Sequence, residues 1–139
     1  MKSNIFIAGS GGIGQAAGLI LLEFQFFDAT IYFGDVHQKA IDDAILFVKE
    51  GCSHPVSVYG VLMPKEDSDE ILDKALANCD IILDCLPGSQ APRLALLAKK
   101  YQCHYANLTE YVQETKDVIA IAEGAEQAAQ LFAVGRHAL

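Results

Sequence analysis

Three glycines near the start of the chain have the spacing of a phosphate-binding loop. Gly9, Gly11 and Gly14 fit the pattern G-x-G-x-x-G between an apolar run and a segment with helical periodicity. In such a loop the first glycine allows a tight turn, the second lets a pyrophosphate approach the backbone, and the third lets helix and strand pack closely. The N-terminus of the helix then offers N–H groups to the phosphates. A glycine turn with a purely structural role fits the same pattern.

An acidic residue follows at the distance that a dinucleotide site requires. Asp35 ends the next strand-like segment, 21 residues after Gly14. A carboxylate at this place hydrogen-bonds to the hydroxyls of the adenosine ribose. An aspartate at the end of a strand can also cap the next helix. The loop and the acid together favour a dinucleotide site over a structural turn.

The residues after Asp35 bear on the choice of cofactor. The carboxylate would repel the 2′-phosphate of NADP, and NADP-binding proteins often carry an arginine nearby. Here Val36, His37 and Gln38 follow, and Lys39 is the first cation. NAD is therefore the favoured cofactor. NADP stays open, because a protonated His37 can reach a phosphate.

Strand-like and helix-like segments alternate around these residues. We expect strands at 4–8, 29–34, 56–62, 81–86, 104–108 and 131–134, and helices at 13–24, 38–49, 67–76, 91–101 and 113–126. Asp67 is expected to cap the third helix, with Glu70 completing a variant of the capping box. The alternation predicts an α/β fold with a doubly wound, mainly parallel sheet of about six strands and helices on both faces, a Rossmann fold. Residues 1–139 are expected to form one domain.

The fourth strand offers a further candidate for the site. Leu86, Pro87 and Gly88 lie at its carboxyl end, and ligands of such sheets bind beyond the carboxyl ends of the strands. In a nucleotide-binding sheet, Leu86 and Pro87 would border the ribose of the nicotinamide. A plain turn at Pro87-Gly88 is the alternative.

Charge and composition exclude several classes of function. The net charge is −8 and the pI is about 4.8, so the phosphates of a nucleic acid would be repelled. No apolar run is long enough to cross a membrane, and the N-terminus lacks the pattern of a signal peptide. We therefore expect a cytoplasmic protein without nucleic-acid or membrane partners. No metal site is expected, and buried thiols in a reducing compartment are the favoured reading of the four cysteines, Cys52, Cys79, Cys85 and Cys103.

Four segments resemble the N-terminal dinucleotide-binding domain of the saccharopine dehydrogenase family, which includes saccharopine reductases and lysine dehydrogenases. The segments are IFIAGSGGIGQAAGLILL, YFGDVHQKA, CDIILDCLPGSQAPRLALLAKKYQCHYANLTE and LFAVGRHAL, and the likeness covers residues 4–139. HYANLTE is the most distinctive part. Members commonly show H-Y-x-D-L-T-E, so Asn107 stands where aspartate is usual.

The resemblance implies a set of site residues. The phosphate loop would be Gly9, Ser10, Gly11, Gly12, Ile13 and Gly14; Asp35 and Val36 would meet the adenosine ribose; Leu86 and Pro87 would line the nicotinamide side; Asn107, Leu108 and Thr109 would lie near the substrate edge. A place in the core for Leu108, and a helix cap at Thr109, are structural alternatives. His104 and His137 have no visible partner, so no catalytic residue is named.

The resemblance also implies a function. A complete family enzyme would pass a hydride between the nicotinamide and a secondary amine or imine carbon of an amino acid. Family enzymes continue into a substrate-binding domain, whereas this sequence ends at Leu139. We therefore expect the cofactor-binding part of such an oxidoreductase, catalytically incomplete alone. The missing substrate domain or another copy of the chain would cover its exposed face.

Two other classes of nucleotide-binding protein share some of these features. A regulatory nucleotide-binding domain of the potassium-transport type has the glycine loop, the acid and a similar length, but DCLPGSQAP and HYANLTE are not usual there. A short-chain dehydrogenase needs a Tyr-x-x-x-Lys pair. That pair occurs at none of the tyrosines, which are at 32, 59, 101, 105 and 111.

Overall fold

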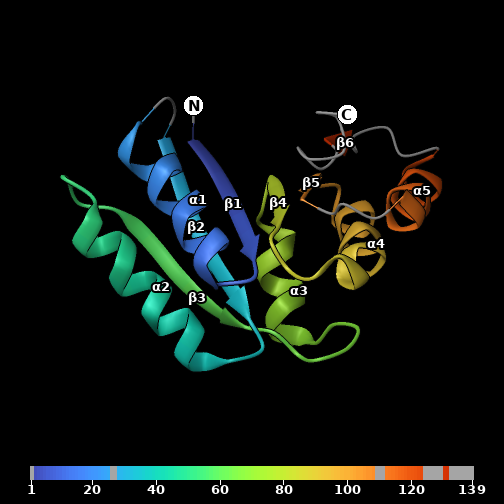
Figure 1. Cartoon of the computed structure of the whole chain (residues 1–139), viewed down its shortest axis with the longest axis horizontal. Helices are drawn as coiled ribbons and strands as arrows, with labels where there is room; N and C mark the ends of the chain where they lie inside the picture. Colours follow the sequence, from blue (N-terminus) through green and yellow to red (C-terminus); the bar gives the residue numbers. More distant parts are fainter. Residues whose placement is uncertain (1, 26–27, 109–111, 124–129, 132–139) are drawn as a thin grey trace.

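Six parallel strands in the order β3-β2-β1-β4-β5-β6 form the centre of the fold (Figure 1). The structure, a computed structural model, describes residues 2–25, 28–108, 112–123 and 130–131. The strands are β1 Lys2–Ala8, β2 Asp28–Asp35, β3 Ser57–Leu62, β4 Ile81–Asp84, β5 His104–Asn107 and β6 Gln130–Leu131. The direction of winding reverses between β1 and β4. This reversal is the switch point at which sheets of this kind bind ligands.

Helices cover both faces of the sheet in the described part of the chain. They are α1 Gly12–Glu23, α2 Gln38–Gly51, α3 Glu70–Ala77, the short 3₁₀ helix η1 Gly88–Gln90, α4 Ala91–Tyr101 and α5 Val112–Ala122. On one face α1 and α2 pack on β1, β2 and β3. On the other face α3, α4 and α5 pack around β1, β4 and β5. The predicted doubly wound α/β fold is confirmed.

Alternate residues of β1 supply the two hydrophobic cores. Ile5 and Ile7 point into the core under α1 and α2, whereas Phe6 and Ala8 point into the core under α3 and α4. All four side chains are almost completely buried. A parallel strand that is covered on both faces therefore reads as a continuous apolar run, which is how β1 could be found in the sequence.

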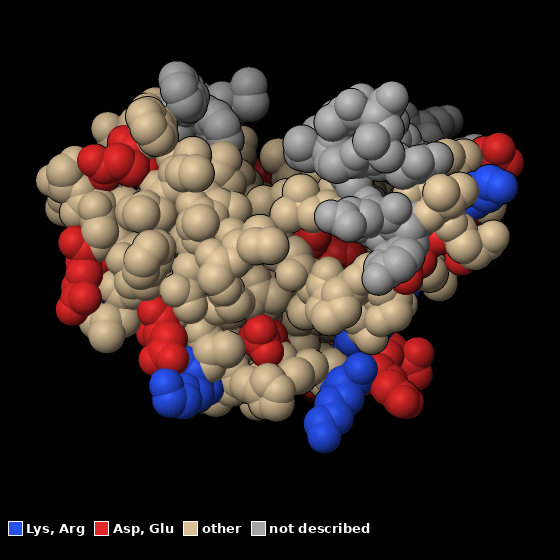
Figure 2. Space-filling view, viewed as in Figure 1, with Lys and Arg blue, Asp and Glu red and all other residues tan. Residues whose placement is uncertain are grey.

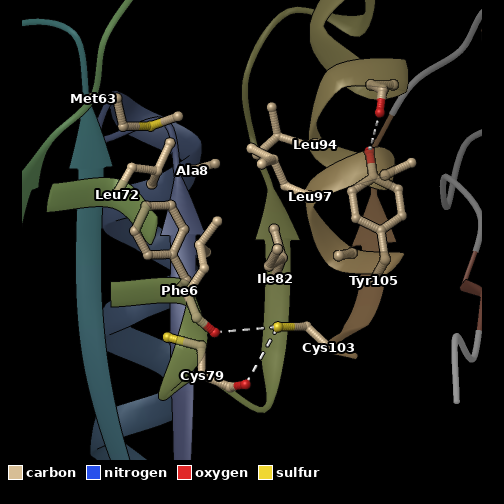
Figure 3. Packing of buried hydrophobic residues seen from close by; sticks show 14 of the residues in the cluster. Phe6, Ala8, Met63, Leu72, Cys79, Ile82, Leu94, Leu97, Cys103 and Tyr105 are labelled. Atoms are coloured by element: carbon tan, nitrogen blue, oxygen red, sulfur yellow. Dashed lines mark hydrogen bonds between the residues drawn. The ribbon is translucent and has the colours of Figure 1, made fainter. Parts of the chain in front are cut away.

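The four cysteines are free thiols; Cys79 and Cys103 are buried as expected, whereas Cys52 and Cys85 are only half-buried. The Cys103 thiol donates to the carbonyl oxygens of Leu76 and Cys79, at 3.6 and 3.3 Å. Figure 3 shows the contact with Cys79. Burial raises the pKa of Cys79 to about 12, and the pKa values of Cys85 and Cys103 to about 11. These thiols stay protonated at neutral pH, which makes them poor nucleophiles.

The start of α3 differs from the prediction. Asp69 is the N-cap, and its side chain accepts a hydrogen bond from the Leu72 amide at 2.9 Å. The predicted cap, Asp67, has left-handed backbone with φ of +53°. The guanidinium of Arg93 on α4 donates to the carbonyl oxygens of Pro64, Lys65 and Asp67, which fixes this turn. The prediction was wrong because a contact from α4 decides the path of the backbone here.

Other bounds differ by a few residues. β4 ends at Asp84 instead of residue 86, because the chain turns there toward η1. Parts of the last predicted helix and strand, 124–126 and 132–134, lie outside the described residues. Within the described residues, no helix combines the length and the apolar character needed to cross a membrane.

Candidate functional site

Three loops meet at the carboxyl edge of the sheet, around the switch point. They are residues 9–11 after β1, 35–37 after β2 and 85–87 after β4. The Gly9 amide donates to the Gly34 carbonyl at 2.8 Å, and the Cys85 amide donates to the Ala8 carbonyl at 2.7 Å. These bonds hold the first residue of the glycine loop to β2 and the end of β1 to the loop after β4.

Two glycines of the loop are required by the fold itself. Gly9 has φ of +98°, and a Cβ on it would lie 2.8 Å from the Cys85 carbonyl oxygen. A Cβ on Gly14 would collide with the Gly9 carbonyl oxygen. These contacts are the tight turn and the close helix packing that the spacing predicted.

Gly11 and Gly12 are different, because nothing in the described structure requires them to be glycine. A Cβ on either residue would have no heavy atom within 4 Å, and neither has left-handed φ. Gly11 is the N-cap of α1, and it makes no side-chain capping hydrogen bond. No acidic residue lies in the first turn of the helix. The result is open space over a helix N-terminus, which is what a phosphate group requires.

Ser10 and Ile13 lie in the predicted loop but face different surroundings. Ser10 is fully buried, and its hydroxyl donates to the Gly34 carbonyl at 3.1 Å. Its amide donates to Asp35, so both donors of Ser10 are directed to the end of β2. Ile13 is exposed on the first turn of α1.

Asp35 ends β2 and links the first two loops. Its Oδ2 accepts a hydrogen bond from the Ser10 amide at 2.9 Å, and its Oδ1 accepts one from the His37 amide at 3.0 Å. The residue is half-buried, and each carboxylate oxygen keeps a second lone pair. The N-cap of α2 is His37, so Asp35 is not the helix cap that the sequence left as an alternative. Val36, next to it, packs against the core around α3 and α4.

Leu86 and Pro87 form the loop after β4. The Leu86 amide donates to Asp84 Oδ1 at 3.0 Å, and Pro87 is the N-cap of η1. Leu86 is half-buried, whereas Pro87 is exposed. A Cβ on Gly9 would lie 3.1 Å from the Leu86 nitrogen, so this loop and the glycine loop are in direct contact.

A buried polar cluster below this loop was missed by the sequence analysis. Asp84 and Tyr105 are each 3% exposed, and the Tyr105 hydroxyl donates to Asp84 Oδ2 at 2.7 Å. Burial raises the pKa of Asp84 to about 6, although the hydrogen bonds from Tyr105 and Leu86 oppose the rise. Burial and the Asp84 charge raise the pKa of Tyr105 above its ordinary value. A lone aspartate inside the apolar run IILDCL was the available signal, because a buried carboxylate requires a partner.

The residues expected at the substrate edge are only partly described. Asn107 ends β5 and is buried, and its Nδ2 donates to the Tyr105 hydroxyl at 3.3 Å. Leu108 is exposed, so it is not a core residue. Thr109 lies outside the described residues.

The described residues contain no group of three or more His, Cys, Asp or Glu side chains that could hold a metal ion. A pocket of about 380 Å³ lies at the opposite edge of the sheet, near Leu22, Asp28 and His54. It is remote from the glycine loop, and the loop geometry indicates the site better than the pocket does.

A glycine loop, an open helix N-terminus and a strand-end carboxylate at the switch point define a dinucleotide-binding domain of the Rossmann type. The family model described as the saccharopine dehydrogenase NADP binding domain matches residues 5–134. The chain therefore belongs to this family. The resemblance seen in the sequence is confirmed.

Solved structures with the same fold are distant in sequence. Saccharopine dehydrogenase (L-Glu forming) from Saccharomyces cerevisiae is 16% identical with a TM-score of 0.70, over 95% of this chain and 27% of that one. Shikimate dehydrogenase from Mycobacterium tuberculosis is 14% identical with a TM-score of 0.71, over 99% and 48%. Levoglucosan dehydrogenase in complex with NADH and levoglucosan is 12% identical with a TM-score of 0.64, over 95% and 35%. The chain thus spans less than half of each structure. No curated protein matches the sequence.

Proposed function

We propose that the chain binds NAD(P) across the three loops. The glycine loop and the N-terminus of α1 would hold the pyrophosphate, Asp35 and Val36 the adenosine ribose, and Leu86 and Pro87 the nicotinamide side. The observation that carries this proposal is the open space at Gly11 and Gly12. The fold does not need glycine there, whereas a pyrophosphate lying against the backbone does.

We further propose that NAD is preferred to NADP. The Asp35 carboxylate supports this, because it would repel a 2′-phosphate, and the residues directly after it, Val36, His37 and Gln38, include no arginine. The description of the family model names NADP, and the levoglucosan dehydrogenase structure contains NADH. Members of this fold thus use both cofactors, and the charge at position 35 is the feature that favours NAD here.

The proposed reaction class is oxidation or reduction at a carbon–nitrogen bond of an amino acid. Membership of the saccharopine dehydrogenase family supports an oxidoreductase over a regulatory nucleotide-binding domain. When bound, the nicotinamide supplies hydride exchange. The residues of this chain would bind and orient the cofactor, and the groups that hold the substrate would come from a further domain or another copy of the chain.

The exposed face of α1 supports the need for such a partner. Ile13, Ile20 and Phe24 are all exposed, and their spacing places them on one side of the helix. Figure 2 shows an uncharged area where α1 lies in Figure 1, whereas charged side chains are visible where α2 lies. Sedimentation velocity tests self-association through this face. Ile20→Lys should weaken it, and Leu96→Lys on the exposed side of α4 is the control; equal effects would contradict the proposal.

Calorimetric titration with NAD⁺, NADH, NADP⁺ and NADPH tests the proposed cofactor site. We expect saturable binding, tighter for the NAD pair, and a smaller preference for NAD in Asp35→Asn. Asp28→Asn at the other end of β2 is the control, because it removes the same charge far from the loops. Tighter binding of NADP by the unchanged protein would contradict the NAD preference. Absence of binding by all four dinucleotides would contradict the proposed function.

A further inference from the structure

Three polar side chains form a buried hydrogen-bonded chain where β4 and β5 end. Asn107 Nδ2 donates to the Tyr105 hydroxyl at 3.3 Å, and this hydroxyl donates to Asp84 Oδ2 at 2.7 Å. Each of the three residues is 3% exposed. Asp84 and Asn107 are also partners in the parallel pairing of the two strands. The sheet register therefore places these groups together, and no proposed ligand contact accounts for Asp84 or Tyr105.

Asn107 gives this chain of hydrogen bonds its direction. A tyrosine hydroxyl has one proton, and here that proton goes to Asp84. If position 107 held aspartate, as is usual in the HYxDLTE motif, the hydroxyl would face two carboxylates with one proton between them. One carboxylate would then have to be protonated. The asparagine amide donates instead, so Tyr105 can hold an ionised Asp84.

The orientation of the Asn107 amide has a cost. Its Oδ1 is buried and has no hydrogen-bond partner in the described structure. An unpaired buried acceptor destabilises the fold.

Asp84 connects this cluster to the glycine loop. Its Oδ1 accepts the hydrogen bond from the Leu86 amide at 3.0 Å, two residues further on. Between them, Cys85 donates its amide to the Ala8 carbonyl at 2.7 Å. The backbone of Cys85 and Leu86 also borders Gly9 closely enough to exclude a side chain there. The Asp84 carboxylate thus fixes the start of the loop at 85–87, next to the glycine loop.

We propose that Asp84 is a positioning residue for the nicotinamide half of the dinucleotide, held by Tyr105 and Asn107 and acting through the Leu86 amide. This inference rests on the proposed function, since it assigns the loop at 85–87 to the nicotinamide side. The ionised carboxylate holds the loop in the orientation that receives the nicotinamide. The adenosine half, which meets the loops at 9–11 and 35–37, does not depend on it.

The electrostatic surroundings of Asp84 give this role a pH dependence. Burial raises its pKa to about 6; Tyr105 on β5 and the Leu86 amide oppose this rise, and Glu114 on α5 adds to it. From α4, the carbonyl oxygen of Ala91 lies 3.4 Å from the Tyr105 hydroxyl. Protonation removes the charge that strengthens the hydrogen bond from Leu86. The grip on the loop should therefore weaken as the pH falls through about 6.

A ratio of two affinities tests this role. Calorimetry of the full chain measures its affinity for NAD⁺ and for ADP-ribose, which lacks the nicotinamide. The ratio of the two affinities is the gain in affinity due to the nicotinamide. In the unchanged protein we expect this gain to fall about fivefold as the pH is lowered from about 7.5 to about 5.5, the size of one lost hydrogen bond. Any change near the adenosine half acts on both ligands and cancels in the ratio.

Two variants and one control complete the experiment. Tyr105→Phe should move the pH profile of the ratio to higher pH, because it removes a hydrogen bond that lowers the pKa of Asp84. Asp84→Asn should abolish the pH dependence. Tyr101→Phe is the control: it deletes a hydroxyl from another tyrosine–aspartate pair, with Asp73, and should leave the profile unchanged.

The outcomes separate this inference from the proposed function. Binding of both ligands with the same ratio and pH profile in Tyr105→Phe as in the unchanged protein would overturn the positioning role alone. Failure of the unchanged protein to bind either ligand would overturn the proposed function, and the inference with it. If Asp84→Asn does not fold, Tyr105→Phe still decides, because it removes a single oxygen.

Discussion

The strands β2 and β4 both end in an aspartate that makes the same local contact. Asp35 accepts a hydrogen bond from the amide of His37, and Asp84 accepts one from the amide of Leu86, each two residues further along. The second oxygen of each carboxylate reaches another element: Asp35 accepts from the Ser10 amide, and Asp84 accepts from the Tyr105 hydroxyl. The two carboxylates differ in their access to solvent.

This difference separates two roles for one residue type. Asp35 is half-buried at the end of β2, so its remaining lone pairs are free to meet a ligand. Asp84 is buried, and its pKa is raised to about 6 because burial disfavours the charged form. The end of β2 is therefore suited to binding a ligand. At the end of β4, the Asp84 carboxylate instead holds a loop, and its charge changes in the physiological range of pH.

The largest expected effect on stability concerns the glycine loop, which lies beside Asp35. Gly14→Ala should lower the free energy of unfolding by about 4 kcal/mol or more, because its Cβ would collide with the Gly9 carbonyl. Gly11→Ala should change stability by less than about 1 kcal/mol and weaken dinucleotide binding. Urea unfolding and calorimetry measure the two effects. Equal destabilisation by both substitutions would mean that the space at Gly11 is not open.

The pH dependence of stability should distinguish the two carboxylates next. Asp84 has a pKa of about 6 in the folded protein, against an ordinary value of 3.8. The folded state therefore binds this proton more tightly, so its contribution to stability is greatest below pH 4 and is lost as the pH rises through 6. Two pKa units correspond to about 3 kcal/mol. The unfolding free energy of Asp84→Asn, relative to the unchanged protein, should rise by about that amount between about pH 4 and pH 7.

The same titration of Asp35→Asn is the comparison for Asp84→Asn. A pH-dependent gain in unfolding free energy of equal size for Asp35→Asn would contradict the contrast between the half-buried Asp35 and the buried Asp84. A flat difference curve for Asp84→Asn would mean that the buried carboxylate is not perturbed.

Loss of the Tyr105 hydroxyl should have an intermediate effect. Tyr105→Phe leaves buried Asp84 and Asn107 without their shared partner, which should cost about 2 kcal/mol of stability. Tyr101→Phe, whose hydroxyl bonds to the half-buried Asp73, should cost less, about 0.5 kcal/mol. Thermal and urea unfolding of the two variants test this. Equal losses would show that the buried cluster has no special weight.

Asp35→Asn should cost less stability than Tyr105→Phe. The amide oxygen can still accept one of the two backbone hydrogen bonds, so the cost should be about 1 kcal/mol at neutral pH. Its effect on NAD binding should be larger than its effect on unfolding. A loss of stability larger than that of Tyr105→Phe would contradict the assignment of binding to Asp35 and of a structural hold on the loop to Asp84.

The features that the sequence predicted depend on neighbours in the chain. The glycine loop, the acid after β2 and the alternation of strands and helices are set by local spacing and periodicity, and all are present in the fold. The hydrogen bond between Asp84 and Tyr105 could not be predicted this way. It joins residues 21 apart, whose meeting depends on the register of β4 and β5.

The predicted start of α3 was wrong for a related reason. Both Asp67 and Asp69 are acceptable caps by residue type. The choice between them depends on Arg93, more than twenty residues later, which binds the carbonyls of the preceding turn. The spacing predicted that a pyrophosphate approaches the backbone of the glycine loop. That the space at Gly11 and Gly12 is empty could be seen only in the structure.

The division of the core into two clusters has a consequence for folding during synthesis. The fully enclosed residues of the core under α1 and α2 run from Ile5 to Val58, so they leave the ribosome as one continuous segment. The core on the other face combines Phe6 with residues as late as Val118. A nascent chain can therefore assemble β1, β2 and β3 with their helices first. The other face of β1 stays uncovered until the second half of the chain emerges, which makes it a natural contact for a chaperone.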